Sequence, residues 1–203
     1  MNPSDIRPAL MYVEDAYDLG RGFLKELFNE SDWSFVVKAH ALVEAATAQL
    51  LTAELGEPRL KLVIAQLEHS NSQSGRLAFL KALNLATEDQ RRFIRRFSEL
   101  RNHLVHNVHN VRFTFVDGLA AMSEDQQKAF TEWVGYFGGN DVARKKYREW
   151  AMSTPKLTLW LGVLLLVGQF ALLTEKAGVR RQRIQEALRK LDELGGGDQP
   201  PEI

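Results

Sequence analysis

The sequence predicts an all-α protein. From about Glu88 onward, apolar residues recur at the 3.6-residue period of a helix, with charged residues on the other side. Two long apolar stretches, at about 33–55 and 157–173, have the length of helices. The alternating, β-prone run at 111–116 stands alone, and one such run cannot make a sheet. We therefore expect a helical bundle with an N-terminal helical arm and a long C-terminal helix.

Composition limits the class of protein. A chain of 203 residues suits one domain with a sizeable core, or one domain plus an arm. Its 26 Lys and Arg balance 26 Asp and Glu, so binding to nucleic acid would depend on a local basic patch. The absence of cysteine excludes disulfides, thiolate metal sites and thiol catalysis. The N-terminal residues lack the pattern of a signal peptide, so we expect a cytoplasmic protein.

The first two predicted elements are an arm and a central helix. Residues 1–30 form an amphipathic segment, expected to fold as one or two short helices packed on the bundle. A helix is then expected from about Trp33 to Leu55, because Ser31 or Asp32 can cap its start and Gly56 its end. This helix is apolar almost all round, which predicts a central position.

Shorter elements are expected on both sides of the helix that starts at Glu88. Two helices, over 59–68 and 76–85, flank a polar loop in which His69 is expected to be solvated. Residues 111–116 are expected to be extended. The capping-box residues at the start of 123–137 predict a helix there, and another helix is expected over 141–150.

The last long element is expected to begin at Pro155. Its apolar part, Leu157–Leu173, is seventeen residues long, and about 17 is the lower limit for a membrane span. We prefer a buried helix without membrane contact, because the apolar helix at 33–55 would otherwise lack a partner. Beyond Gly178 a separate amphipathic helix is expected over 179–194.

The expected organisation therefore has three parts. Residues 1–30 form the arm, and residues 31–176 form the bundle. Residues 177–203 contain the C-terminal amphipathic helix and a disordered tail that begins at the glycines 195–197.

The helix that starts at Glu88 has two contrasting faces. Its apolar stripe contains Phe93, Ile94, Phe97, Leu100, Leu104, Val105 and Val108. Arg101 projects into the middle of this stripe, and its permanent charge requires a carboxylate, a phosphate or a partner surface there. The opposite face carries Arg91, Arg92, Arg95, Arg96, Asn102, His103 and His106.

Arg101, Asn102 and His106 match the Arg-Asn-x-x-x-His motif of the HEPN families (higher eukaryotes and prokaryotes nucleotide-binding domains). The segment 31–176 resembles HEPN proteins, with a nearer likeness to relatives of the mannitol operon repressor. The resemblance implies a HEPN-like helical bundle, a homodimer with the motif at the shared interface, and RNA as substrate. It gives His106 the role of proton-transfer group, Arg101 that of phosphate clamp and Asn102 that of polar support. HEPN toxins regulated by nucleotidylation carry Tyr where this chain has Val108.

The chemistry of these residue types fits RNA cleavage without a metal or cofactor. A histidine can take a proton from the 2′-hydroxyl near neutral pH, and a guanidinium can bind two phosphate oxygens. Residues five apart on an ideal helix point about 140° away from each other. Arg101 and His106 therefore converge only if the helix distorts near Val105 or a second chain completes the pocket. His103 and the four arginines of the basic face are expected to bind RNA.

Several alternatives stay open at the level of sequence. Glu44 lies with His40 and Thr47 on one side of the helix at 33–55; it either bonds locally or faces water, or serves as the internal counter-ion of Arg101. The spacing of His103, His106 and His109 could suit a metal, but no acidic or thiolate ligand is adjacent, so we expect none.

Two functions of different classes follow. One is a metal-independent endoribonuclease, such as a toxin or an antiviral (phage-defence) effector, with an antitoxin or regulatory partner. The other is a non-enzymatic dimeric regulator or adaptor related to the mannitol operon repressor. An intact Arg101 and His106 pair favours the first.

Overall fold

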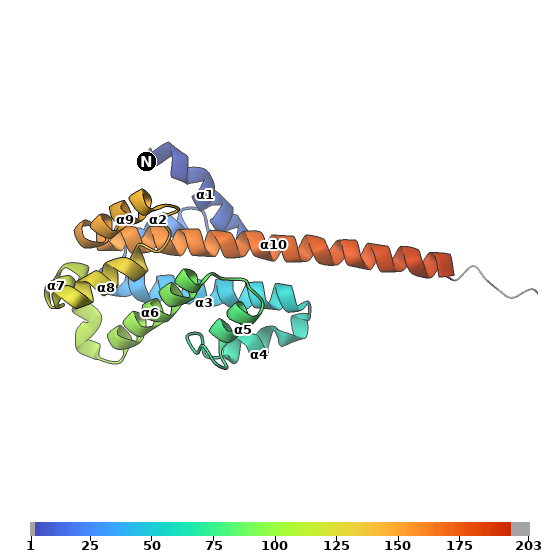
Figure 1. Cartoon of the computed structure of the whole chain (residues 1–203), viewed down its shortest axis with the longest axis horizontal. Coiled ribbons are helices and arrows are strands. Elements are labelled where there is room, and N and C mark those ends of the chain that lie inside the picture. Colours follow the sequence, from blue (N-terminus) through green and yellow to red (C-terminus); the bar gives the residue numbers. More distant parts are fainter. Residues whose placement is uncertain (1–2, 196–203) are drawn as a thin grey trace, which may run out of the picture.

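A computed structural model describes residues 3–195 and confirms the all-α fold, with no strand in that range (Figure 1). Its helices and 3₁₀ turns are α1 (Pro3–Ala16), α2 (Phe23–Asn29), α3 (Asp32–Leu55), η1 (Pro58–Leu60), α4 (Lys61–Gln66), α5 (Arg76–Ala82), α6 (Glu88–Val105), η2 (Val108–Arg112), α7 (Phe115–Ala120), α8 (Glu124–Val134), α9 (Asp141–Ser153) and α10 (Pro155–Gly195). The predicted tail at 196–203 lies outside the described residues.

Helices α3 and α10 lie side by side and form the centre of the bundle (Figure 1). The Ser31 side chain accepts a hydrogen bond from the Ser34 N–H at 3.2 Å, which caps the start of α3. Gly56 ends it with φ +76°, a left-handed conformation that glycine adopts without a steric cost. Phe35, Val43 and other apolar side chains of α3 are fully buried, so the predicted central position is confirmed.

Helix α10 is one continuous helix, which corrects the predicted break at Gly178. A glycine inside a helix costs only about 1 kcal/mol relative to alanine, and the charged segment after it consists mostly of good helix formers. Burial of α10 in the bundle ends at Ala177, and the rest of the helix projects beyond α3 (Figure 1). The expected boundary at 176/177 therefore marks the end of packing but not the end of a helix.

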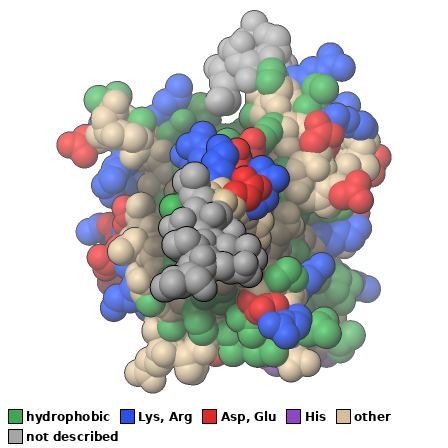
Figure 2. Space-filling view, turned by 90° about the vertical axis from the view of Figure 1, so that its right-hand side faces the viewer, with side chains coloured by type: hydrophobic (Ala, Val, Ile, Leu, Met, Phe, Trp, Pro, Cys, Tyr) green, Lys and Arg blue, Asp and Glu red, His purple; other side chains and the backbone are tan. Residues whose placement is uncertain are grey.

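Within the described range, α10 is the one helix long and apolar enough to span a membrane. A core helix of a soluble bundle passes the same test of length and composition, and most of the apolar part is buried against the other helices. The absence of membrane contact stays a prediction. The end of the molecule that faces the viewer in Figure 2, seen down its long axis, carries basic, acidic and apolar side chains, and neither sign of charge predominates there.

The N-terminal arm consists of two helices, within the expected number. Val13 of α1 and Leu24 and Leu27 of α2 are buried in the core. The Tyr17 hydroxyl donates to the carbonyl of Val167 at 2.9 Å, and the Trp160 indole donates to the carbonyl of Leu24 at 2.9 Å. Both bonds tie the arm to α10.

The segment expected to be extended at 111–116 is helical, which corrects that prediction. It is divided between η2 and α7. Thr114 caps α7 by accepting the Asp117 N–H at 3.1 Å, and Asp32 of α3 accepts the Phe115 N–H at 2.8 Å. Phe115 is buried against Phe35. Capping and this tertiary contact outweigh the β propensity of the run.

Helix α6 packs beneath α3 and carries the predicted motif at its C-terminal end (Figure 1). Thr87 and Gln90 form a reciprocal capping box at its start. Phe93, Ile94, Phe97 and Leu104 of the predicted stripe are buried. The stripe stops there, because Val105 is 36% exposed and Val108 lies in η2 with 78% of its surface exposed.

Candidate functional site

The motif residues occupy the last turn and the C-cap of α6. The Trp33 indole donates to the carbonyl of Leu104 at 3.2 Å, which fixes this end of α6 against α3. His106 is the C-cap, and its N–H still donates to the carbonyl of Asn102 at 3.2 Å with helical φ and ψ. The helix is therefore not distorted near Val105, and Arg101 and His106 project about 140° apart. One chain alone does not bring them together.

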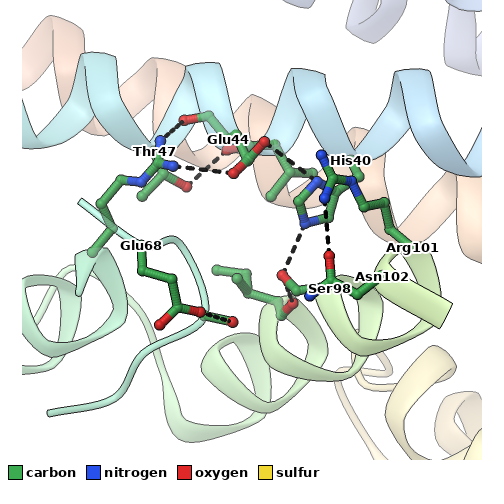
Figure 3. Close-up of polar contacts among 11 residues, drawn as sticks. His40, Glu44, Thr47, Glu68, Ser98, Arg101 and Asn102 are labelled. Carbon is green, nitrogen blue, oxygen red and sulfur yellow. Dashed lines mark hydrogen bonds and ion pairs between the residues drawn. The ribbon is translucent and has the colours of Figure 1, made fainter. Parts of the chain in front are cut away.

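Arg101 is half-buried and has no carboxylate partner within 4.0 Å in the described part of the chain. Its Nη1 donates to Asn102 Oδ1 at 2.9 Å, so Asn102 orients the guanidinium. Its Nε is buried without a hydrogen-bond partner. Figure 3 shows the side chain extending from α6 towards α3. Its positive charge is thus held in place but not neutralised.

Of the alternatives left open for Glu44, the structure excludes the pairing with Arg101 and shows a local contact with His40 and an ion pair with Arg76. Glu44 Oε1 accepts from Arg76 Nη2 at 3.0 Å, and Arg76 Nη1 also donates to the Glu44 carbonyl at 3.2 Å. Glu44 Oε2 lies 3.5 Å from His40 Nδ1. Arg76, the first residue of α5, reaches Glu44 because α5 packs against α3. Both carboxylate oxygens of Glu44 therefore lie against residues other than Arg101: Oε1 against Arg76 and Oε2 against His40 (Figure 3).

We call His40, Glu44, His69 and Arg76 the inner cluster. The Ser98 hydroxyl donates to the carbonyl of Ile94 at 2.9 Å and lies 2.9 Å from His40 Nε2. Since the Ser98 proton is used, His40 Nε2 must donate in this contact. His40 Nδ1 then faces Glu44 Oε2.

His69 is buried, which corrects the prediction of a solvated loop residue. It is 5% exposed, and its ring meets the His40 ring edge-on at 5.4 Å between centroids. The loop folds tightly because Gly75 approaches the Glu68 carbonyl so closely that a Cβ would lie 2.1 Å from that oxygen. The Arg76 N–H donates to the same carbonyl at 2.9 Å. These contacts turn His69 towards α3.

Burial and charge set the protonation of the inner cluster. The contact with His40 lowers the pKa of Glu44 to about 2, although burial opposes this; His69 and Arg76 lower it further. Burial, with the charges of Arg76 and His40, lowers the pKa of His69 to about 3, against the opposing effect of Glu44. Burial also lowers the pKa of the Arg76 guanidinium, which its bond to Glu44 partly offsets. His69 is therefore neutral near pH 7, and Glu44 is ionised.

Buried nitrogen atoms without partners are concentrated here. Among the described side chains, five buried polar atoms have no hydrogen-bond partner. They are His40 Nδ1, His69 Nδ1, His69 Nε2, Arg76 Nε and Arg101 Nε. All belong to the inner cluster or to Arg101, and of the two guanidinium groups only that of Arg76 pairs with Glu44 among the described residues. Potential donors exceed acceptors at this place in the fold.

The predicted basic face is partly neutralised. Arg92 pairs with Asp89, and Arg96 pairs with Glu99 at 2.8 Å. Arg91 donates to the carbonyl of Ala86. Arg95 is exposed and has no ion pair in the described range. Arg91, Arg92 and Arg95 line one hollow of about 500 Å³ together with Ser72, Gln73, Leu77, Lys81 and Glu88.

The surface around His106 carries exposed histidine and valine side chains. His103, His106 and His109 are all exposed. Val105, Val108 and Val111 beside them are 36%, 78% and 51% exposed. Asn110 donates to the carbonyl of His103 at 2.8 Å and holds η2 against the end of α6. Residues 3–195 contain no group of three acidic or imidazole side chains placed to hold a metal ion.

Sequence reasoning missed Arg76, Ser98 and the burial of His69. Arg76 stands at the start of a short predicted helix, where an arginine is ordinarily solvated. The indirect signal for it was Glu44 on an otherwise apolar helix, where a carboxylate that is not solvated needs a partner. His69 gave no signal, since its burial depends on the path of the loop.

Comparison of the chain with protein-family models, curated proteins and solved structures finds no match. What the chain does must be inferred from its own residues and their geometry.

Proposed function

We propose that the chain is a metal-independent endoribonuclease that cleaves single-stranded RNA at a site shared by two protomers. The observation that carries this proposal is Arg101, a half-buried guanidinium oriented by Asn102 with no carboxylate partner among residues 3–195. Glu44 of α3, the carboxylate considered as its counter-ion, is taken by Arg76 and His40. The missing counter-charge of Arg101 can be a phosphate from outside the chain.

The reaction would be a transfer within the RNA chain. His106 takes the proton of a 2′-hydroxyl, and the 2′-oxygen attacks the adjacent phosphorus. Arg101 stabilises the charge that develops on the phosphate oxygens. The bond to the 5′-oxygen breaks, and that oxygen takes up a proton. The products are a 2′,3′-cyclic phosphate and a 5′-hydroxyl, with no change in oxidation state.

A homodimer would resolve the divergence of the two side chains. The exposed Val105, Val108 and Val111 beside the motif form an apolar surface that a second copy can cover. In a two-fold pair through this surface, Arg101 of one protomer can meet the partner's His106 on one phosphate. RNA damage of this kind fits a toxin or phage-defence effector, which would need an antitoxin or another regulatory partner.

The test is cleavage of single-stranded RNA by purified protein. We expect His106→Ala and Arg101→Ala each to lower the rate by about 10² to 10⁴-fold without changing the melting temperature, and the double variant to lose little more. Cleavage should persist in excess EDTA and leave 2′,3′-cyclic ends. Activity that EDTA removes, or wild-type cleavage in His106→Ala, would reject the proposal.

The dimer is tested in parallel by light scattering. A mixture of the inactive Arg101→Ala and His106→Ala proteins should regain cleavage, because each mixed dimer contains one intact composite site. A monomer at micromolar concentration, or no recovery on mixing, would reject the shared site.

A second candidate is a non-enzymatic dimeric regulator or adaptor. The observation that favours it is the geometry in one chain, where Arg101 turns towards α3 and His106 faces solvent. In that case the valine surface would mediate assembly alone. A dimer that binds RNA or a protein partner but cleaves no RNA, and is not toxic when overexpressed, would establish this alternative.

A further inference from the structure

A hollow of about 750 Å³ lies at the opposite end of α6 from the motif. Its walls come from α1, the start of α6, the turn between α8 and α9, and α10. Gln90, which lines it, lies roughly 17 Å along the axis of α6 from Arg101 and roughly 24 Å from His106. Its volume lies within the range of roughly 300–1,000 Å³ that small-molecule sites occupy. Nothing in the proposed nuclease reaction uses it.

The main chamber of this hollow is apolar. Its lining includes Val13, Phe137 and three leucines of α10. Leu165 and Leu172 are 50% and 48% exposed although they belong to the most apolar helix of the chain. Gly168 stands between them, and a Cβ there would meet only Val13, at 3.5 Å. The missing side chain of Gly168 leaves room for a ligand between the two leucines.

One end of the chamber is basic. Asp89, Tyr136 and Arg144 also line a second hollow of about 210 Å³, to which Arg92, Glu132 and Arg148 contribute. The two hollows therefore adjoin, and the second one is lined by three guanidinium groups and two carboxylates. Asp89 pairs with Arg92 and lies 3.8 Å from Arg144. In the described range, Arg148 has no ion pair. One positive charge at this end is not balanced.

The side of the chamber also offers a polar contact. Gln90 donates from Nε2 to Gln169 Oε1 at 2.6 Å, and its own Oε1 accepts the Thr87 N–H at 2.8 Å. The amide oxygens of both side chains are therefore occupied, and the NH₂ group of Gln169 remains to donate. A ligand would meet donors and cations here, which suits an acceptor with negative charge.

We propose that this hollow binds a small amphipathic anion. Its apolar body, an acyl chain or aromatic group of roughly 10 to 15 heavy atoms, would fill the chamber around Gly168. Its single anionic head, a carboxylate or a phosphate, would lie against Arg144 and Arg148. The site is separate from the motif and does not depend on nuclease activity.

Isothermal titration with ten-carbon amphiphiles below their micelle concentrations tests the proposal. Decanoate and decyl phosphate represent the two heads, while decanol and decyltrimethylammonium have the same chain without the negative charge. We expect saturable binding at one site per chain, at least tenfold tighter for one of the anions than for decanol, and none for the cation. The tighter anion identifies the head. Equal binding of all four would reduce the hollow to a non-specific apolar surface and overturn the proposal.

Three variants locate the binding. Gly168→Leu fills the chamber and should weaken binding at least tenfold. Leu172→Asp, at a half-exposed wall position, gives the same readout should Gly168→Leu fail to fold. Arg148→Gln should weaken the anion about five- to tenfold but leave decanol unchanged. Arg96→Gln, whose arginine pairs with Glu99 outside the hollow, is the matched control. Unchanged affinity in a folded chamber variant would place the ligand elsewhere and refute the site.

Discussion

The inner cluster and the motif end of α6 use the same residue types for opposite purposes. In the inner cluster, Arg76 is almost fully buried and meets a carboxylate 3.0 Å away. At the motif end, Arg101 meets only the neutral side chain of Asn102, and His106 faces solvent. The two sites adjoin through His40 and Ser98 (Figure 3). An arginine paired inside the fold becomes an uncompensated buried charge when its carboxylate is removed, whereas an oriented arginine without a carboxylate is available to an external anion.

The largest effect expected from this comparison is on stability. Glu44→Ala leaves the buried Arg76 unpaired and should lower the free energy of unfolding by about 3–5 kcal/mol. Glu44→Gln should cost less, because it keeps an acceptor, and the double variant Glu44→Ala/Arg76→Met should cost less than the two single changes together. Arg101→Met should change stability by less than about 1 kcal/mol. Urea titration measures these variants and the single variant Arg76→Met, and equal losses for Glu44→Ala and Arg101→Met would show that the two sites do not differ in this way.

The next effect is a dependence of stability on pH. The pKa of His69 in the folded protein, about 3, lies below its ordinary value of 6.5. The contribution of His69 to the free energy of unfolding is therefore complete above pH 6.5 and is lost as the pH falls towards 3. From pH 7 to pH 5 the loss should be about 2 kcal/mol. Below pH 4.5 the lowered pKa of Glu44 adds a loss of the same sign.

Matched asparagine variants separate the two sites in this measurement. His69→Asn cannot be protonated and should flatten the change in the free energy of unfolding between pH 7 and pH 5. His103→Asn, at the exposed motif end, should leave it unchanged. A flat profile in the unmodified protein would mean that His69 is not buried in solution.

The smallest effect concerns RNA affinity on the basic face. Arg95 has no ion pair among the described residues, so Arg95→Gln should lower the slope of log affinity against log salt by about 0.7 for single-stranded RNA. Arg96 pairs with Glu99, so Arg96→Gln should lower it less. Fluorescence anisotropy measures this slope from about 50 to 200 mM salt, with each arginine variant made in the His106→Ala protein. His103→Ala should weaken binding only slightly, and a larger change for Arg96→Gln than for Arg95→Gln would contradict the assignment.

The sequence by itself determined the helical class and most element positions, because those depend on local signals. The 3.6-residue period of α6, its capping box and the glycine after α3 act within a few residues of each other. Local signals failed where distant residues decide. Asp32 and Phe35 of α3 help to make 115–120 helical. The continuity of α10 through Gly178 is a different case, because the strong helix formers on both sides are local signals that outweigh one glycine.

Only the tertiary structure decided the partners of the charged residues. The position of Arg101 in an apolar stripe predicted that it needs an anion, and Glu44 was one candidate for that role. This alternative is wrong, because α5 and the loop before it bring Arg76 to Glu44. A burial pattern states that a charge must be neutralised, but which group does so depends on how the helices pack, because ion pairs form only over a few ångströms.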